Sequence, residues 1–275
     1  MKAAAFEYVR PRDLGEAVAM LAQSSGAAKL LAGGQSLGPM LNLRLARPQR
    51  LIDISRLAEL RRIEDIGDHW RIGAAVTHAE LEDADGSFGG SKMISEVAGG
   101  IAYRSVRNRG TIGGSIAHAD PAGDWPLALA ALGAEIVVYG PAGERRLPAD
   151  GIIRAAFTTE LRDDEIIRAI EVPKPTPSAR FGYFKFCRKV GEFPEASAAI
   201  LLDPARRLAR IFIGALESGP RALPSLARAV AQGGRAACTR EAAIAAVRDA
   251  TELDSIDRGM HAAVLLKALQ QVFPP

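Results

Sequence analysis

Two glycine pairs, each followed closely by a hydroxyl side chain, are the residues of this chain that best suit ligand binding. The first pair, Gly33 and Gly34, ends the apolar run 30–32 and precedes Gln35 and Ser36. Glycine adopts positive φ at little steric cost and lets a ligand approach the main chain. A strand that ends in such a turn, before a segment that can begin a helix, presents N–H groups that suit a phosphate or diphosphate. An ordinary strand–turn–helix junction is the alternative, because short glycine motifs often occur by chance.

The second pair, Gly113 and Gly114, lies 80 residues later in the sequence TIGGSIAHADPAGDWP, between Thr111 and Ser115. We expect it to form a second glycine loop, and two such loops suit a dinucleotide better than one phosphate. Neither pair has the spacing G-x-G-x-x-G, and we find no acidic residue at the end of a second parallel strand, which argues against a standard nicotinamide Rossmann domain. No GK[ST] sequence occurs, which excludes a P-loop.

The composition of the chain argues against several classes of function. The chain has 275 residues, a net charge of +3 and two cysteines that are far apart. Without a Cys-x-x-Cys or Cys/His spacing, this chain alone holds no iron–sulfur cluster or structural zinc. No basic patch with groove-reading elements is visible, so nucleic acid is not an expected partner. No apolar run is long enough for a membrane span or a secretory signal, and the cytoplasm is the expected compartment.

Apolar periodicity predicts the elements that position the glycine pairs. Residues 1–55 read as a β-α-β-α-β layer. Hairpins are expected at 60–74 and 135–149, helices at 78–83, 92–99 and 127–132, and a strand at 165–172. The sequence PKPTP at 173–177 has the composition of a linker. Beyond it, three strands are expected at 180–188, 197–202 and 207–216, and helices at 223–231, 241–250 and 256–272.

The sequence AGGQSL at 32–37, together with TIGGSIAHADPAGDWP at 111–126, resembles the FAD-binding medium subunit of the xanthine dehydrogenase / carbon monoxide dehydrogenase family of molybdenum hydroxylases. The resemblance covers the whole chain. It implies an α+β fold with a PCMH-type (vanillyl-alcohol-oxidase-like) FAD-binding domain at 1–175, made of two α/β subdomains at about 1–55 and 56–175. It also implies a C-terminal domain at 176–275, in which a three-stranded antiparallel sheet packs with helices.

The same resemblance implies a set of FAD-binding residues. They are Leu31, Ala32, Gly33, Gly34, Gln35, Ser36, Leu37, Ile101, Thr111, Gly114, Ser115, Asp120, Asp124, Ile167 and Lys185. Members of the family often have Asn in place of Ser115, and eukaryotic members often have an aromatic residue in place of Ile101. Helix capping by the two aspartates and a solvated Lys185 are the structural alternatives. Three arginines, Arg104, Arg107 and Arg109, read mainly as a solvated face.

No nucleophile, carboxylate pair or metal set appears in the sequence, which fits a chain whose chemistry belongs to a cofactor. The resemblance implies an electron-transfer subunit that binds FAD. Its partners would be a large subunit with a molybdenum–pterin cofactor and a small subunit with two [2Fe–2S] clusters, in a dimer of heterotrimers. One alternative is a self-sufficient FAD-dependent oxidoreductase of the same fold. The other is a non-catalytic assembly or nucleotide-binding module.

Overall fold

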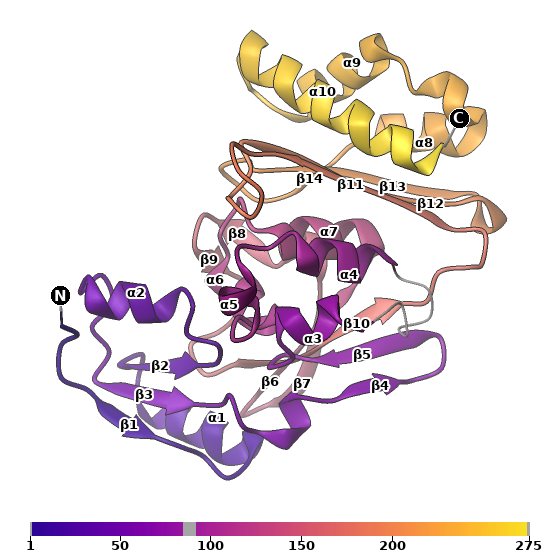
Figure 1. Cartoon of the computed structure of the whole chain (residues 1–275). Coiled ribbons are helices and arrows are strands. Elements are labelled where there is room, and N and C mark those ends of the chain that lie inside the picture. Colours follow the sequence, from indigo (N-terminus) through magenta and orange to yellow (C-terminus); the bar gives the residue numbers. More distant parts are fainter. Residues whose placement is uncertain (1, 85–91, 274–275) are drawn as a thin grey trace.

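The computed structural model describes residues 2–84 and 92–273, and its N-terminal part is built on a parallel sheet. The strands, in the order β1-β3-β2, are β1 (Glu7–Val9), β3 (Arg50–Asp53) and β2 (Ala28–Leu31). Helices α1 (Leu14–Gln23) and α2 (Leu37–Asn42) lie on opposite faces of this sheet (Figure 1). The Asp13 side chain accepts a hydrogen bond from the N–H of Glu16 and so begins α1. The predicted β-α-β-α-β layer is confirmed.

The middle of the chain forms an antiparallel sheet in the order β4-β5-β10-β6-β7. The strands are β4 (Ile63–Asp65), β5 (His69–Gly73), β6 (Glu135–Gly140), β7 (Gly143–Pro148) and β10 (Ile166–Pro173). The helices of this part are α3 (His78–Glu82), α4 (Lys92–Gly99), α5 (Arg104–Arg107), α6 (Ile112–His118) and α7 (Asp124–Leu132). A small hairpin joins β8 (Ile153–Ala155) to β9 (Thr158–Thr159). Both predicted hairpins of the middle part, at 60–74 and 135–149, are confirmed.

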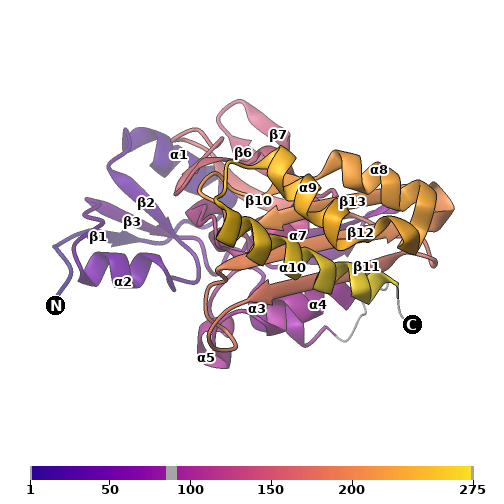
Figure 2. The same cartoon turned by 90° about the horizontal axis from the view of Figure 1, so that it is seen from above.

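The C-terminal part is a sheet in the order β11-β12-β13-β14, covered by three helices. Its elements are β11 (Arg180–Phe186), β12 (Ala196–Asp203), β13 (Leu208–Gly214), β14 (Arg221–Ala222), α8 (Pro224–Gly233), α9 (Arg240–Ala250) and α10 (Ser255–Val272). Short 3₁₀ helices lie at Ala58–Leu60, Ala149–Gly151, Pro204–Arg206 and Gly234–Ala237. Seen from above, the helices cover the outer face of the sheet (Figure 2).

Helix α7 lies between the two larger sheets, which explains its composition. Every residue of DWPLALAAL is buried, because β12 and β13 cover one side of the helix and the middle part covers the other. A helix that is apolar on all sides requires such an environment. Strand β12 is likewise buried along its whole length, with α7 on one face and α10 on the other. Gly133, in the left-handed conformation, ends α7.

The structure differs from the sequence predictions in two places that concern the fold. The second glycine pair lies in helix α6 and not in a loop. The C-terminal sheet has a fourth strand, β14, which is only two residues long and therefore carries no readable periodicity. The division of the chain at 173–177, and the subdomain boundary near 55, stay predictions.

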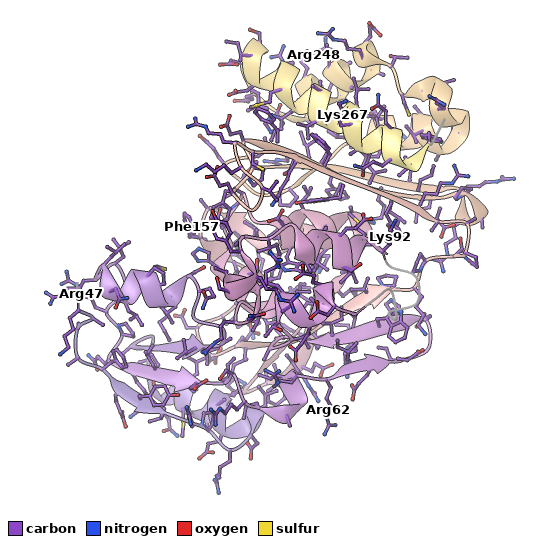
Figure 3. The ribbon with its side chains drawn as sticks, in the orientation of Figure 1. Arg47, Arg62, Lys92, Phe157, Arg248 and Lys267 are labelled. Carbon is purple, nitrogen blue, oxygen red and sulfur yellow. The ribbon has the colours of Figure 1, made fainter. Side chains whose placement is uncertain are left out.

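The labelled side chains of Arg47, Arg62, Arg248 and Lys267 extend from the outer surface of the molecule (Figure 3). Among the buried polar residues, Asp53, Thr77 and Thr111 lie between the N-terminal and middle parts, and Asp124 lies between the middle part and the C-terminal sheet.

Candidate functional site

A cleft of about 640 Å³ separates the N-terminal sheet from the middle part of the chain. Its volume falls in the range typical of small-molecule and cofactor sites. Its lining residues are Tyr8, Arg10, Leu31, Ala32, Gly33, Asp53, Ser55, Arg56, Arg61, Ala75, Thr77, Ala79, Glu80, Asn108, Arg109 and Thr111. Four of the predicted FAD-binding residues, Leu31, Ala32, Gly33 and Thr111, are among them, so the cleft brings both glycine stretches together.

The first glycine turn, residues 33–36, carries a run of free backbone donors and meets this cleft at Gly33. The main-chain N–H groups of Gly33, Gly34, Gln35 and Ser36 have no acceptor within the described residues. Gly34 has a φ of +72°, a conformation that side chains other than glycine adopt at a cost. Ser36 is the N-cap of α2, but its side chain makes no capping hydrogen bond, so its hydroxyl is also available. Consecutive N–H donors in such a turn suit the oxygens of a phosphate or diphosphate.

The second glycine stretch passes so close to position 33 that only glycine fits there. A Cβ at this position would lie 2.0 Å from the carbonyl oxygen of Arg109 and 2.8 Å from the Cα of Gly110. Both neighbours are backbone atoms and cannot move aside independently. The turn 33–36 and the segment that leads into α6 therefore form adjacent walls of the cleft.

The second glycine pair has a different structural role from the first. Thr111 begins α6, and its Oγ1 accepts from the N–H of Gly114 at 3.1 Å. The N–H groups of the three neighbouring residues are also occupied: Ile112 donates to Val76, Gly113 to Ala74 and Ser115 to Thr111. A Cβ on Gly113 would lie 2.5 Å from the Cβ of Ala74. The prediction of a second glycine loop is therefore wrong: Gly113 and Gly114 lie in the first turn of α6, where Gly113 allows close packing against Ala74.

Arginine side chains give the cleft a positive wall. Arg56 and Arg109 line it, and neither pairs with an acidic side chain in the part of the chain that the structure describes. By contrast, Arg107 is mostly buried, bonds Glu82 and donates to the carbonyl groups of residues 101 and 102. Arg104 pairs with Glu82 and Asp83. Of the three arginines expected on a solvated face, Arg107 is structural and Arg109 is free to bind an anion.

Asp124 and Lys185, both predicted as cofactor contacts, contact each other. Lys185 Nζ lies 2.8 Å from Asp124 Oδ1 and 2.9 Å from the carbonyl oxygen of Gly100, and the Tyr183 hydroxyl donates to the same carboxylate. Burial raises the pKa of Asp124, while the lysine charge opposes that rise. Burial and the nearby carboxylate raise the pKa of Tyr183 well above its usual value. This group joins α7, β11 and the turn after α4.

The remaining predicted residues lie in separate elements of the fold. Leu37 begins α2, and Ile101 packs on the core beside the Gly100–Lys185 contact. Asp120 Oδ1 accepts from the N–H of Ala122, so this side chain shapes the turn before α7. Ile167 is buried in β10 opposite Val138. Neither Asp120 nor Ile167 lines the cleft.

Three cleft residues that sequence reasoning missed form a hydrogen-bonded group. Asp53 ends β3 and accepts from the Tyr8 hydroxyl; Arg10 Nε lies 2.8 Å from that hydroxyl and 3.4 Å from Asp53 Oδ2. An acidic residue therefore does follow the first glycine pair at the end of the next parallel strand, contrary to the sequence analysis. The spacing of 20 residues from Gly33 to Asp53 could have indicated this acidic residue from the sequence.

His78 and Trp125 form a buried pair that packs against the second glycine stretch at Gly110. The indole N–H of Trp125 donates to His78 Nδ1 at 3.1 Å. A Cβ on Gly110 would lie 2.8 Å from the histidine ring, so the chain passes directly over it. Burial, with a smaller contribution from the Arg107 charge, lowers the pKa of His78 to about 4. The ring is therefore neutral at pH 7 and accepts the indole hydrogen.

The donor set of the cleft fits a dinucleotide: free main-chain N–H groups, two unpaired arginines and an acidic residue at a strand end. No group of three or more His, Cys, Asp and Glu side chains among the described residues is placed to bind a metal ion. Within the same residues, no helix is long and apolar enough to cross a membrane.

Comparisons with known proteins agree with this geometry. Residues 4–175 match the family model described as FAD binding domain in molybdopterin dehydrogenase. The carbon monoxide dehydrogenase medium chain of Hydrogenophaga pseudoflava is 42% identical over 197 residues, 72% of this chain and 69% of that protein. The nicotine 6-hydroxylase medium subunit of Paenarthrobacter nicotinovorans is 37% identical over 74% of this chain and 71% of that protein.

Solved structures extend the similarity to the whole chain. A chain of carbon monoxide dehydrogenase from Hydrogenophaga pseudoflava superposes with a TM-score of 0.92 at 34% identity, covering 99% of both chains. A chain of quinoline 2-oxidoreductase from Pseudomonas putida 86 gives a TM-score of 0.88 at 28% identity, covering 99% of this chain and 98% of that one. The predicted fold class is thereby confirmed. This chain belongs to the family of FAD-binding domains of molybdopterin dehydrogenases, the medium subunits of molybdenum hydroxylases.

Proposed function

We propose that this chain is the FAD-binding electron-transfer subunit of a heterotrimeric molybdenum hydroxylase. The observation that carries the proposal is the run of free N–H groups at 33–36, which meets a cleft with unpaired arginines at Gly33. When bound, FAD supplies the redox chemistry that connects [2Fe–2S] clusters on a small partner subunit with an external acceptor. A large partner subunit would hold the molybdenum–pterin cofactor. A dimer of heterotrimers and a cytoplasmic location belong to the same proposal.

Within this proposal, the turn 33–36 binds the diphosphate through its main chain, and Arg56 and Arg109 neutralise its charge. Both kinds of donor contribute to binding of a diphosphate: main-chain N–H groups fix its position, and arginine adds charge-assisted hydrogen bonds. The side chains of Thr111 and Ser115 add hydroxyl groups from α6. Residues 31, 32, 37 and 167 supply apolar or main-chain surface.

Asp124 and Lys185 would act at the other end of the cofactor site. Their exposed fractions are 7% and 11%, so the pair is held away from water. A buried ion pair of this kind loses much stability if one partner is removed, because the other charge is left unpaired. We propose that the pair fixes Gly100 and Ile101 in position beside the flavin, and that Asp120 shapes the adjoining turn.

Flavin content of the purified protein tests the proposal. The chain, expressed with its partner subunits, should carry stoichiometric flavin that is released as FAD and not as FMN. Its cofactor should be reduced by the substrate of the molybdenum subunit only in the assembled complex. A chain without FAD would contradict the proposed function. Reduction of the isolated chain by an organic substrate would favour a self-sufficient flavoenzyme.

A further inference from the structure

Asp53 occupies a distinctive place in the cleft, at the carboxyl end of the central strand of the parallel sheet. It pairs in register with Leu31 on β2, two residues before Gly33. In parallel sheets, ligands bind outside the carboxyl ends of the strands. The glycine turn follows one strand here and the carboxylate ends its neighbour. The two features therefore face the same end of the sheet, and both line the cleft.

The surroundings of Asp53 keep it as a charged acceptor. Its exposed fraction is 8%. Burial alone would raise the pKa of its carboxyl group, but hydrogen bonds from Ser55 and Tyr8 and the charge of Arg10 hold that pKa below its usual value. The Ser55 N–H donates to Oδ1 at 2.9 Å. The Tyr8 hydroxyl and Arg10 Nε both donate to Oδ2. Because Tyr8 and Arg10 both lie at Oδ2, Oδ1 is the carboxylate oxygen that faces fewer donors, those of Ser55 alone.

Because Oδ1 of Asp53 carries negative charge and accepts hydrogen bonds, the ligand group that binds it should be a neutral hydrogen-bond donor. Phosphate oxygens are anionic acceptors and cannot donate to a carboxylate. They are matched by the free N–H groups at 33–36 and by Arg109. The group attached to a dinucleotide's diphosphate is a sugar, whose hydroxyl groups are donors of the kind that an acidic residue at a strand end binds. Resting on the proposed function, we propose that Asp53 binds the ribose hydroxyls of the adenosine half of FAD, with Tyr8 and Arg10 positioning its carboxylate.

Competition between two nucleotides tests this assignment on the full chain freed of flavin. ADP and 2′,3′-dideoxy-ADP carry the same adenine and phosphates and differ only in the ribose hydroxyls. The wild-type chain should bind ADP roughly tenfold more tightly than the dideoxy nucleotide, since a hydrogen bond to a charged group contributes this much. In Asp53→Ala and in the isosteric Asp53→Asn, that ratio should fall towards one.

Matched variants separate a ligand contact from a structural role. Asp65→Asn removes an exposed carboxylate from β4, outside the cleft lining, and should keep the wild-type ratio. Tyr8→Phe disturbs the same hydrogen-bonded group but retains the carboxylate, and should keep most of the preference for ADP. Equal loss of both nucleotides in Asp53→Asn, with the ratio unchanged, would overturn the ribose assignment while FAD binding stands. A chain that binds neither FAD nor ADP would overturn the proposed function and this assignment together.

Discussion

Main-chain N–H groups at 33–36 have no acceptor in the described part of the chain, whereas those at 112–115 are all bonded within the protein. Both stretches contain Gly-Gly and a following serine, yet only the first is a turn; the second is the start of α6. Gly34 is needed for its positive φ and Gly113 for its contact with Ala74. The comparison teaches that a repeated motif can place a binding surface in one copy and a packing surface in the other.

Gly34→Val should have the largest effect on FAD binding. A β-branched residue at a φ of +72° costs of the order of 1–3 kcal/mol and would distort the turn that carries the free N–H groups. We expect FAD affinity to fall by at least ~100-fold, equivalent to about 3 kcal/mol. The C-terminal sheet and its helices should stay folded. Flavin content and circular dichroism measure the two effects.

Gly38→Ala is the matched control for that variant, because Gly38 lies in α2 and nothing lies within 4 Å of an added Cβ. It should retain wild-type FAD affinity. If Gly34→Val also retained its flavin, the diphosphate would not depend on the turn, and the distinction between the two glycine pairs would lose its functional meaning.

Gly113→Ala should act on stability before it acts on binding. The added Cβ would lie 2.5 Å from the Cβ of Ala74, and overpacking of this kind costs about 1–3 kcal/mol. Denaturant unfolding should show that loss, while FAD affinity of the folded protein changes much less than in Gly34→Val. The control Gly259→Ala, in α10 with open space around it, should be neutral or slightly stabilising. Unchanged stability together with lost FAD would assign ligand binding to the second pair.

The neutral His78 beneath the second stretch predicts a pH dependence of stability. Its pKa is about 4 in the folded chain, against 6.5 for an unperturbed histidine, so the unfolded state takes up the proton first as pH falls. The stabilising effect of the neutral ring is present above pH 6.5 and declines between 6.5 and 4. We expect a loss of about 2 kcal/mol in unfolding free energy from about pH 7 to about pH 5 through this residue.

Comparing His78→Gln with the wild-type chain checks that prediction, because glutamine does not titrate. His78→Gln should flatten the stability profile between pH 7 and pH 5, although it lowers the overall stability. Equal pH profiles for the two proteins would show that His78 is not the titrating group.

Arg109→Ala should give the smallest effect of the series. Removing one charge-assisted hydrogen bond to the diphosphate should weaken FAD binding roughly tenfold and reduce its dependence on salt. Arg104→Ala is the control, since Arg104 is already paired with Glu82 and Asp83. If the Arg104 variant weakened FAD binding more than the Arg109 variant, the positive wall of the cleft would lie elsewhere.

Local signals made much of this molecule predictable. The cap at Asp13, the capping box at Thr77 and the left-handed Gly133 are each set by residues a few positions apart. The first glycine turn also follows from local sequence, because a short strand, two glycines and a helix occur in order. The two-residue β14 and the helical state of Gly113 and Gly114 depend on partners distant in sequence, and local propensity does not favour them.

Distant pairs explain why the rest of the site could not be predicted. Tyr8 meets Asp53 because β1 and β3 pair in parallel. Lys185 meets Asp124 because β11 pairs with β12, which packs on α7. Each pair needs a strand register or a packing contact that periodicity alone does not supply. The resemblance named Asp124 and Lys185 separately, and their mutual contact emerged only from the structure.

Amide chemical shifts of the isotope-labelled chain during titration with ADP test the central comparison most directly. Binding of the diphosphate by the turn predicts large shifts of the Gly33, Gly34, Gln35 and Ser36 amides, because their N–H groups gain acceptors. The amides of residues 112–115, already bonded within the protein, should shift much less. Large shifts at 112–115 with little change at 33–36 would contradict the account.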